Sequence, residues 1–133
     1  MGLRTNIAVL GTGTVGRTLA KRLHELGNEV VIGTRDPAPT LLRDGFGARA
    51  AAHPDVTIAT FSKATEGAEP VVNALSGGAS ATGMAAAELE PGTVLLDASN
   101  PLDASAGFPP HLFGADTAHS RSSCSLPSRA CRW

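Results

Sequence analysis

The glycine-rich turn at Gly11, Gly13 and Gly16 constrains the fold of this chain more than any other feature of its sequence. It has the spacing G-x-G-x-x-G and follows residues 7–10, Ile-Ala-Val-Leu, which form a continuous apolar run of strand length. Such a run is typical of a parallel strand that is buried on both faces. The sequence therefore predicts a strand that leads directly into a glycine turn.

The segment after this turn is predicted to be an amphipathic helix that returns the chain to a second strand. Gly27 stands where a C-terminal helix cap belongs, and residues 29–32 form the second strand. Strand, helix and strand together make a βαβ unit. The apolar residues of the predicted helix stripe recur at helical spacing and are Val15, Leu19, Leu23 and Leu26.

The three glycines suit the binding of a dinucleotide, each for a separate steric reason. Gly11 allows a tight turn, Gly13 lets the backbone approach a pyrophosphate, and Gly16 lets the helix pack closely on the strand. The pyrophosphate would then lie on the free N–H groups at the positive end of the helix dipole. The alternative is an ordinary glycine-rich turn, but the strands and helix around it favour the dinucleotide.

The end of the second predicted strand indicates which dinucleotide is bound. An NAD-binding unit usually has Asp or Glu about 20 residues after the first glycine, to bind the ribose 2′-hydroxyl, whereas an Arg nearby accommodates a 2′-phosphate. Gly33 occupies that position here, and Thr34, Arg35 and Asp36 follow. The planar guanidinium of Arg35 suits phosphate oxygens, so we expect NADP rather than NAD. The alternative is a solvated Arg in a surface turn.

Length and composition fit a single α/β domain. The chain has 133 residues, of which 42% are hydrophobic and 4% aromatic, as suits a parallel sheet covered by helices. Its formal net charge of -1 gives no reason to expect nucleic acid, and no apolar run approaches the roughly 18 residues of a membrane span. We therefore expect a cytoplasmic protein without nucleic-acid or membrane partners. Cys124 and Cys131 match no zinc spacing, so no metal site is predicted.

Beyond Arg35, strands and helical segments are predicted to alternate, which gives an α/β fold with a Rossmann-type doubly wound parallel sheet. Helical turns are expected at 41–44 and 62–66, the second capped by Ser62, and a longer helix at 80–89. Apolar runs at 56–61, 70–75 and 93–97 predict the third, fourth and fifth strands.

Three loops are candidates for a ligand site because of their position in such a sheet. In an open α/β sheet, ligands bind beyond the carboxyl ends of the strands, where the strand order reverses. This rule selects residues 11–16, 73–78 and 98–101, and the last two loops are expected to flank the nicotinamide half of a dinucleotide. Asn73 and Asn100 are candidates for cofactor contact, although both could instead be turn formers.

Four segments at these loops match the pattern of a known family. They read Ile-Ala-Val-Leu-Gly-Thr-Gly-Thr-Val-Gly at 7–16, Ile-Gly-Thr-Arg-Asp-Pro at 32–37, Val-Val-Asn-Ala-Leu at 71–75 and Leu-Asp-Ala-Ser-Asn-Pro-Leu-Asp at 96–103. Together they resemble the N-terminal domain of the NADPH-dependent reductases of the deazaflavin coenzyme F-420. The first segment occurs in many Rossmann proteins, whereas the Ser-Asn-Pro-Leu-Asp motif is shared by a much narrower set of proteins.

The resemblance implies hydride transfer between C4 of NADPH and a deazaflavin or similar small-molecule acceptor. It places Thr12 to Val15 at the pyrophosphate, and Thr34 with Arg35 at the 2′-phosphate. Such a reaction depends on cofactor positioning more than on an acid or base, so no catalytic residue is assigned. A homo-oligomer is left open. The predicted cofactor-binding residues are Gly11, Thr12, Gly13, Thr14, Val15, Gly16, Thr34, Arg35, Asn73, Ala74, Leu75, Ala98, Ser99, Asn100 and Pro101.

The predicted NADP-binding domain spans residues 1–117, and residues 118–133 are predicted to be a disordered tail. The tail contains three Arg, no acidic residue and no apolar period. Reductases of this family are expected to continue after such an Asp-Thr pair with an amphipathic helix. We interpret the tail as a reading-frame accident, because restoring one base in an allowed codon string produces that helix start. The C-terminal elements of the sheet would then be missing.

Two other functions stay open at this point. The first is an NADP-binding module without turnover, as expected if the structure on the acceptor side is missing. The second is another Rossmann reductase, for example of imines or hydroxyacids. A catalytic Lys or Asp on a C-terminal helical domain would favour such a reductase, and no such domain is present in this sequence.

Overall fold

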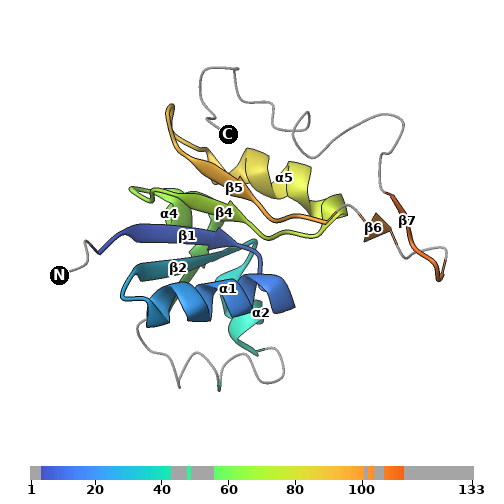
Figure 1. Ribbon diagram of the computed structural model, residues 1–133, viewed down its shortest axis with the longest axis horizontal. Helices are drawn as coiled ribbons and strands as arrows, with labels where there is room; N and C mark the ends of the chain where they lie inside the picture. Colours follow the sequence, from blue (N-terminus) through green and yellow to red (C-terminus); the bar gives the residue numbers. More distant parts are fainter. Residues whose placement is uncertain (1–3, 43–47, 49–55, 101, 104–106, 113–133) are drawn as a thin grey trace.

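Five parallel strands form the centre of the structure, a computed structural model that describes residues 4–42, 48, 56–100, 102–103 and 107–112. The strands are β1 (Asn6–Leu10), β2 (Glu29–Thr34), β3 (Val56–Thr60), β4 (Val71–Asn73) and β5 (Leu95–Asp97). Their order across the sheet is β3-β2-β1-β4-β5, and all neighbours are parallel (Figure 1). This order reverses between β1 and β4, which confirms the predicted Rossmann-type fold.

The predicted βαβ unit is present. β1 leads into α1 (Thr14–Glu25), and α1 returns the chain to β2, where Ile7 of β1 lies beside Val30. Gly27 follows the helix with a φ of +92° and donates its N–H to the carbonyl oxygen of His24 at 2.8 Å. This left-handed backbone favours glycine, so the prediction that Gly27 ends the helix is confirmed.

The buried face of α1 differs from the predicted stripe. Val15 and Leu26, which were expected on that face, are 52% and 62% exposed. The face that packs on the sheet instead consists of Gly16, Leu19, Ala20 and Leu23, at the spacing i, i+3, i+4 and i+7. Two small residues let the helix approach the sheet closely, and this contact decides which face is buried. The predicted stripe considered only large apolar residues, and it was therefore wrong at its first and last residues, Val15 and Leu26.

Helix α2 (Pro37–Leu42) begins earlier than the helical turn that was predicted at 41–44. Asp36 caps it, because its Oδ1 accepts the N–H of Ala38 at 3.3 Å. Pro37 takes the first helical position, where the missing proline N–H would have no partner in any case. Asp followed by Pro is thus a helix start here, which the prediction overlooked.

The ends of β3 and β4 lie one or two residues before their predicted positions. β3 ends at Thr60 instead of Phe61, and Thr60 stands in the cap position of α4 (Phe61–Thr65) instead of Ser62. Phe61 is the first residue of the helix, and its ring is buried in the core, only 6% exposed. β4 ends at Asn73, two residues before the predicted end, since the side-chain Oδ1 of Asn73 accepts the N–H of Leu75 at 3.3 Å and turns the chain.

Helix α5 (Gly77–Ala87) begins three residues before the predicted start at Ser80. Ser80 is buried and its hydroxyl is bonded to the side chain of Asn73, so it cannot cap the helix. Gly83 lies on the packed face, where a Cβ would collide with Cδ1 of Leu75 and lie 3.5 Å from the ring of Phe61. Glycine therefore lets α5 approach the sheet and α4 closely.

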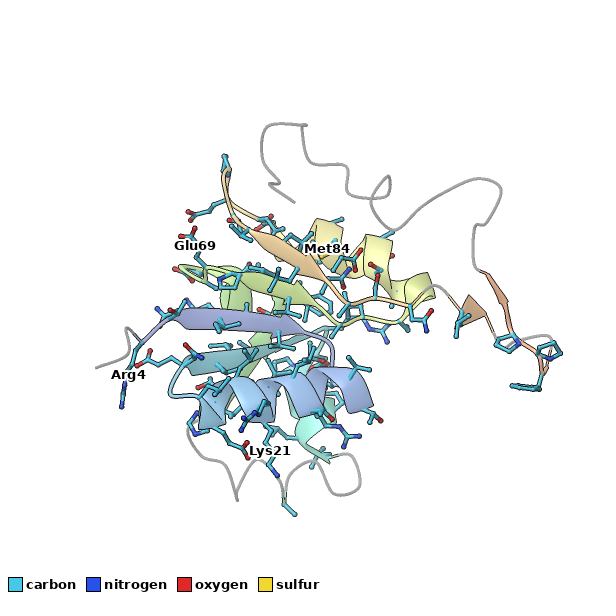
Figure 2. All side chains as sticks on the ribbon, viewed as in Figure 1. Arg4, Lys21, Glu69 and Met84 are labelled. Carbon is cyan, nitrogen blue, oxygen red and sulfur yellow. The ribbon has the colours of Figure 1, made fainter. Side chains whose placement is uncertain are left out.

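Each face of the sheet buries an apolar cluster. α1 packs over a cluster that includes Val9 and Ile32, and α4 and α5 pack over one that includes Leu10 and Met84. Figure 2 labels Met84 on α5, together with Lys21, whose charged side chain lies at the surface of α1. The architecture has three layers, as expected for a doubly wound fold.

A two-stranded antiparallel hairpin, β6 (Leu102–Asp103) with β7 (His111–Leu112), follows the sheet and was not predicted. In Figure 1 it lies on the same side as the carboxyl ends of the parallel strands. Within the part of the chain that the structure describes, no helix is long and apolar enough to cross a membrane. The predictions for residues 118–133, including Cys124 and Cys131, fall outside the described residues.

Candidate functional site

The three predicted loops converge at the carboxyl ends of β1, β4 and β5. The glycine turn meets the loop after β4, because Ala74 donates its N–H to the carbonyl oxygen of Leu10 at 2.8 Å. That loop in turn meets the one after β5, since Ala98 donates to the carbonyl oxygen of Asn73 at 2.9 Å and Ser76 pairs with Asn100. The predicted site residues of these loops that the structure describes, all except Pro101, are thus brought together at the reversal of strand order.

The three glycines of the turn have different surroundings, as their predicted roles require. Gly11 has a φ of +121°, and a Cβ there would lie 2.6 Å from the carbonyl oxygen of Ala74. A Cβ at Gly16 would collide with the carbonyl oxygen of Gly11, so the helix packs directly on the turn. Around Gly13, in contrast, a Cβ would meet nothing within 4 Å. Two glycines are needed for the fold, and the third leaves open space where a ligand could approach the backbone.

The N-terminus of α1 has the properties of an anion site. No side chain hydrogen-bonds to its cap position, and its first turn contains no acidic residue. The first N–H groups of a helix have no partner within the helix, so they are free to bind an anion here. Thr14 and Val15 are exposed at this end, and Thr12 is half-buried. The exposure of Val15 follows from its place at the open end of the helix.

Arg17 is a residue of this turn that the sequence analysis missed. Its Nε donates to the carbonyl oxygen of Gly13 at 3.4 Å, so its guanidinium lies along the glycine turn. A basic side chain beside the free N–H groups adds positive charge where a pyrophosphate would lie. Its place three residues after the N-terminus of α1 was visible in the sequence, but the direction of its side chain was not.

Thr34 and Arg35 are the predicted 2′-phosphate residues, and they differ in whether their side chains are free to bind a phosphate. Thr34 is 7% exposed, and its hydroxyl lies 3.0 Å from that of Thr40. Because Thr40 donates its own proton to the carbonyl oxygen of Asp36 at 2.7 Å, Thr34 must be the donor to Thr40. Its hydroxyl therefore has no proton left for a phosphate and instead stabilises the turn that presents the exposed Arg35.

A surface pocket of about 220 Å³ lies beside Arg35. Its described lining includes the hydroxyl residues Thr60, Ser62 and Thr82, which come from the end of β3, from α4 and from α5. A guanidinium and hydroxyl groups can all donate hydrogen bonds, and none of these lining residues is a carboxylate, so the pocket suits an anion. The sequence analysis missed the three hydroxyl residues because only the tertiary structure brings them to Arg35.

The loops after β4 and β5 contain a buried polar side chain where a cofactor contact was predicted. Asn73 is only 2% exposed, and its Nδ2 donates to Ser80 Oγ at 2.8 Å and to Asp97 Oδ1 at 3.2 Å. Its side chain is therefore already used within the protein, and a direct contact with a cofactor stays a prediction. Leu75 is also buried, whereas Ala98 and Asn100 are exposed. Pro101 lies outside the described residues.

Ser99 has an unusual place in this region. Its N–H is bonded to Asp97 Oδ1 at 3.0 Å, but its hydroxyl oxygen is buried and has no hydrogen-bond partner within the part of the chain that the structure describes. A buried hydroxyl without a partner is costly and rare in proteins. Together with the open space at Gly13, this unpaired hydroxyl fits a site built for a polar ligand.

Comparisons with known proteins identify the family of this chain. The profile of the family described as coenzyme F-420-dependent NADP oxidoreductase matches residues 6–101. A search of the curated proteins gives no match. Among solved structures, a candidate F-420-dependent NADP reductase from Arthrobacter sp. FB24 is 48% identical, with a TM-score of 0.81 over 87% of this chain and 54% of that one.

A second solved structure, a hypothetical protein from Sinorhizobium meliloti, is 28% identical with a TM-score of 0.63. The match covers 84% of this chain and 51% of that protein. The chain thus spans about half the length of these two solved structures. The family profile covers most of the chain, including all three loops up to Pro101. The chain therefore belongs to the family of coenzyme F-420-dependent NADP oxidoreductases.

Proposed function

We propose that this chain binds NADP(H) at the carboxyl ends of its parallel strands and supplies the cofactor side of a hydride transfer to a deazaflavin or a similar small-molecule acceptor. The single observation that carries the proposal is the glycine turn. It combines open space over Gly13 with a helix N-terminus that has neither a capping side chain nor an acidic residue in its first turn. This combination is what a pyrophosphate requires.

The residues after β2 favour NADP over NAD. The usual position of the acidic residue is taken by Gly33, where a Cβ would lie 2.6 Å from Cδ2 of Leu10, so a longer side chain has no room there. Asp36 turns its carboxylate to the N–H of Ala38 at the start of α2. Arg35 is exposed beside a pocket lined by hydroxyl groups, and it can meet a 2′-phosphate with charge-assisted hydrogen bonds.

The chain's own contribution to the reaction is to hold and orient the cofactor. When bound, the cofactor supplies a hydride at C4 of its nicotinamide ring. The glycine turn and α1 would bind the pyrophosphate, Arg35 the 2′-phosphate, and the loops after β4 and β5 would orient the nicotinamide half. Correct orientation of two reactants alone contributes a large part of such a rate enhancement, so this chemistry does not require an acid–base pair.

The activity is tested by mixing the chain with NADPH and an oxidised deazaflavin and following the absorbance of both. We expect NADPH to be consumed in step with reduction of the deazaflavin. Binding without any turnover would instead support the second candidate, an NADP-binding module. The observation that favours that candidate is that the chain spans about half the length of the two solved structures described above. Absence of both binding and turnover would contradict both candidates.

Replacing Arg35 should remove most of the preference for NADPH over NADH. A hydrogen bond to a charged group contributes about 1.5–3 kcal/mol. We therefore expect Arg35→Ala to lower the affinity for NADPH about tenfold or more and to leave the affinity for NADH unchanged. The measurement is calorimetric titration with both cofactors. Arg22→Ala is the matched control, since Arg22 lies on the exposed face of α1 and pairs with Glu25 at 3.3 Å. An unchanged preference in Arg35→Ala would contradict the assignment.

A further inference from the structure

Three polar side chains connect the loops that are proposed to flank the nicotinamide half of the cofactor. Asn73 at the end of β4 and Ser80 on α5 are each 2% exposed, and Asp97 at the end of β5 is half-buried. Asn73 is the centre of this group, because its Nδ2 donates to both Ser80 and Asp97. We call these three residues the polar cluster.

The polar cluster also fixes the backbone of both loops. The Oδ1 of Asn73 accepts the N–H of Leu75 at 3.3 Å, which directs the loop after β4. On the other side, Asp97 Oδ1 accepts the N–H of Ser99 at 3.0 Å, and the carbonyl oxygen of Asn73 accepts the N–H of Ala98 at 2.9 Å. One set of hydrogen bonds therefore holds two loops in a single relative position.

Stability alone does not account for such a cluster. Replacing both partners of a buried hydrogen bond by apolar groups of the same shape is often nearly neutral, so burying polar groups brings little net stability. A fully bonded polar network, however, specifies one geometry and is rigid. The place of the polar cluster, beneath two loops at the reversal of strand order, is where a rigid geometry matters for a ligand.

Ser99 is the residue that the polar cluster holds by its backbone. Its hydroxyl oxygen is buried and without a hydrogen-bond partner in the described part of the chain, while the residue as a whole is half-buried. Because Ser99 as a whole is only half-buried, a change of its χ1 rotamer is enough to change which groups its hydroxyl can meet. A hydroxyl can both donate and accept, as can the carboxamide of a nicotinamide ring.

We propose that the polar cluster positions Ser99 so that its hydroxyl hydrogen-bonds to the nicotinamide half of the cofactor. Ser99 is then the residue that contacts the cofactor, and Asn73, Ser80 and Asp97 act through it as positioning residues. This inference rests on the proposed binding of NADP(H). The sequence analysis expected Ser99 among the cofactor-binding residues and left open whether Asn73 contacts the cofactor or only forms a turn. The new element is that Asn73, Ser80 and Asp97 act through Ser99.

The test compares NADPH with 2′,5′-ADP, a probe that has the adenosine half and lacks the nicotinamide half. In calorimetric titration, we expect Ser99→Ala to lower the affinity for NADPH about three- to tenfold, which corresponds to the loss of one ordinary hydrogen bond. The affinity for 2′,5′-ADP should not change. The melting temperature should not fall, because the hydroxyl that is removed has no hydrogen-bond partner among the described residues. Thr93→Val is the matched control, a hydroxyl deletion two residues before β5 begins.

The positioning role is tested by combining substitutions. Asn73→Ala removes three hydrogen bonds and is expected to lower the melting temperature, so Ser80→Ala, which removes one, is measured beside it. If the cluster acts through Ser99, the losses of NADPH affinity in Ser80→Ala and Ser99→Ala are not additive in the double variant. Additive losses would overturn the positioning role.

The outcomes separate this inference from the proposed function. If the unmutated chain binds neither NADPH nor 2′,5′-ADP, the proposed function is wrong and the inference is overturned with it. If the unmutated chain binds both and Ser99→Ala binds NADPH equally well, only the inference is overturned. If Ser99→Ala lowers the affinities for NADPH and 2′,5′-ADP equally, the inference is also overturned, since the effect would not be confined to the nicotinamide half.

Discussion

Gly13→Val is expected to abolish NADPH binding while leaving the fold intact. Gly13 has a φ of -71° and a ψ of -178°, an extended backbone that valine adopts readily. Since a Cβ there would meet nothing within 4 Å, the new side chain displaces no protein atom. It would instead fill the space through which a pyrophosphate reaches the backbone N–H groups. Losing two hydrogen bonds to a charged group, at about 1.5 kcal/mol or more each, corresponds to at least about a hundredfold in affinity.

Two measurements check this expectation together. Calorimetric titration should detect no binding of NADPH to Gly13→Val, and thermal unfolding without cofactor should give the melting temperature of the unmutated chain. Lys21→Ala is a suitable control, because Lys21 lies on the exposed side of α1, where its Nζ is 3.9 Å from Glu25. If Gly13→Val binds NADPH normally, the glycine turn is not the phosphate site.

Gly16→Val, three residues after Gly13, is expected to lower the stability of the fold, whereas Gly13→Val is expected to leave it unchanged. In Gly16→Val the new Cβ would collide with the carbonyl oxygen of Gly11 and approach the Cβ of Ala74 to 3.6 Å. The first of these contacts is with backbone and cannot be relieved by turning a side chain, so α1 must move away from the turn. Overpacking of this kind costs about 1–3 kcal/mol or more, and each kcal/mol lowers the melting temperature of a chain of this size by roughly 4 °C.

Thermal unfolding in the absence of cofactor is the measurement for Gly16→Val. The absence of cofactor matters, since a bound ligand would raise the melting temperature by itself. Gly13→Val serves as the matched control for adding a valine to this turn. A melting temperature for Gly16→Val equal to that of Gly13→Val would show that α1 does not pack on the turn as described.

The first half of the fold could be predicted from the sequence because its signals are local. An apolar strand, three spaced glycines and a glycine after the helix each specify a backbone conformation within a few residues. The helix face was harder to predict, because Gly16 and Ala20 determine it by being small. Hydrophobic spacing alone favours large residues such as Val15 and Leu26, which the structure exposes.

The site was predicted as a set of loops, but the roles of several side chains were not. The hydroxyl of Thr34 is bonded to Thr40, and the side chain of Asn73 is bonded to Asp97, a residue that is distant in sequence. Sequence spacing gives no information on such partners, since both are brought into contact only when the strands and helices pack. Ser99 could be assigned to a loop from the sequence, but only the structure shows that its hydroxyl is buried and without a hydrogen-bond partner among the residues described.

The central claim, that this chain binds NADP(H) and prefers it to NAD(H), is tested most directly by calorimetric titration of the purified, unmutated chain with NADPH and NADH. With Arg35 exposed beside a pocket of hydroxyl groups and Gly33 in the usual acidic position, we expect NADPH to bind about tenfold more tightly or better. Equal affinities for the two cofactors, or no binding of either, would contradict the claim.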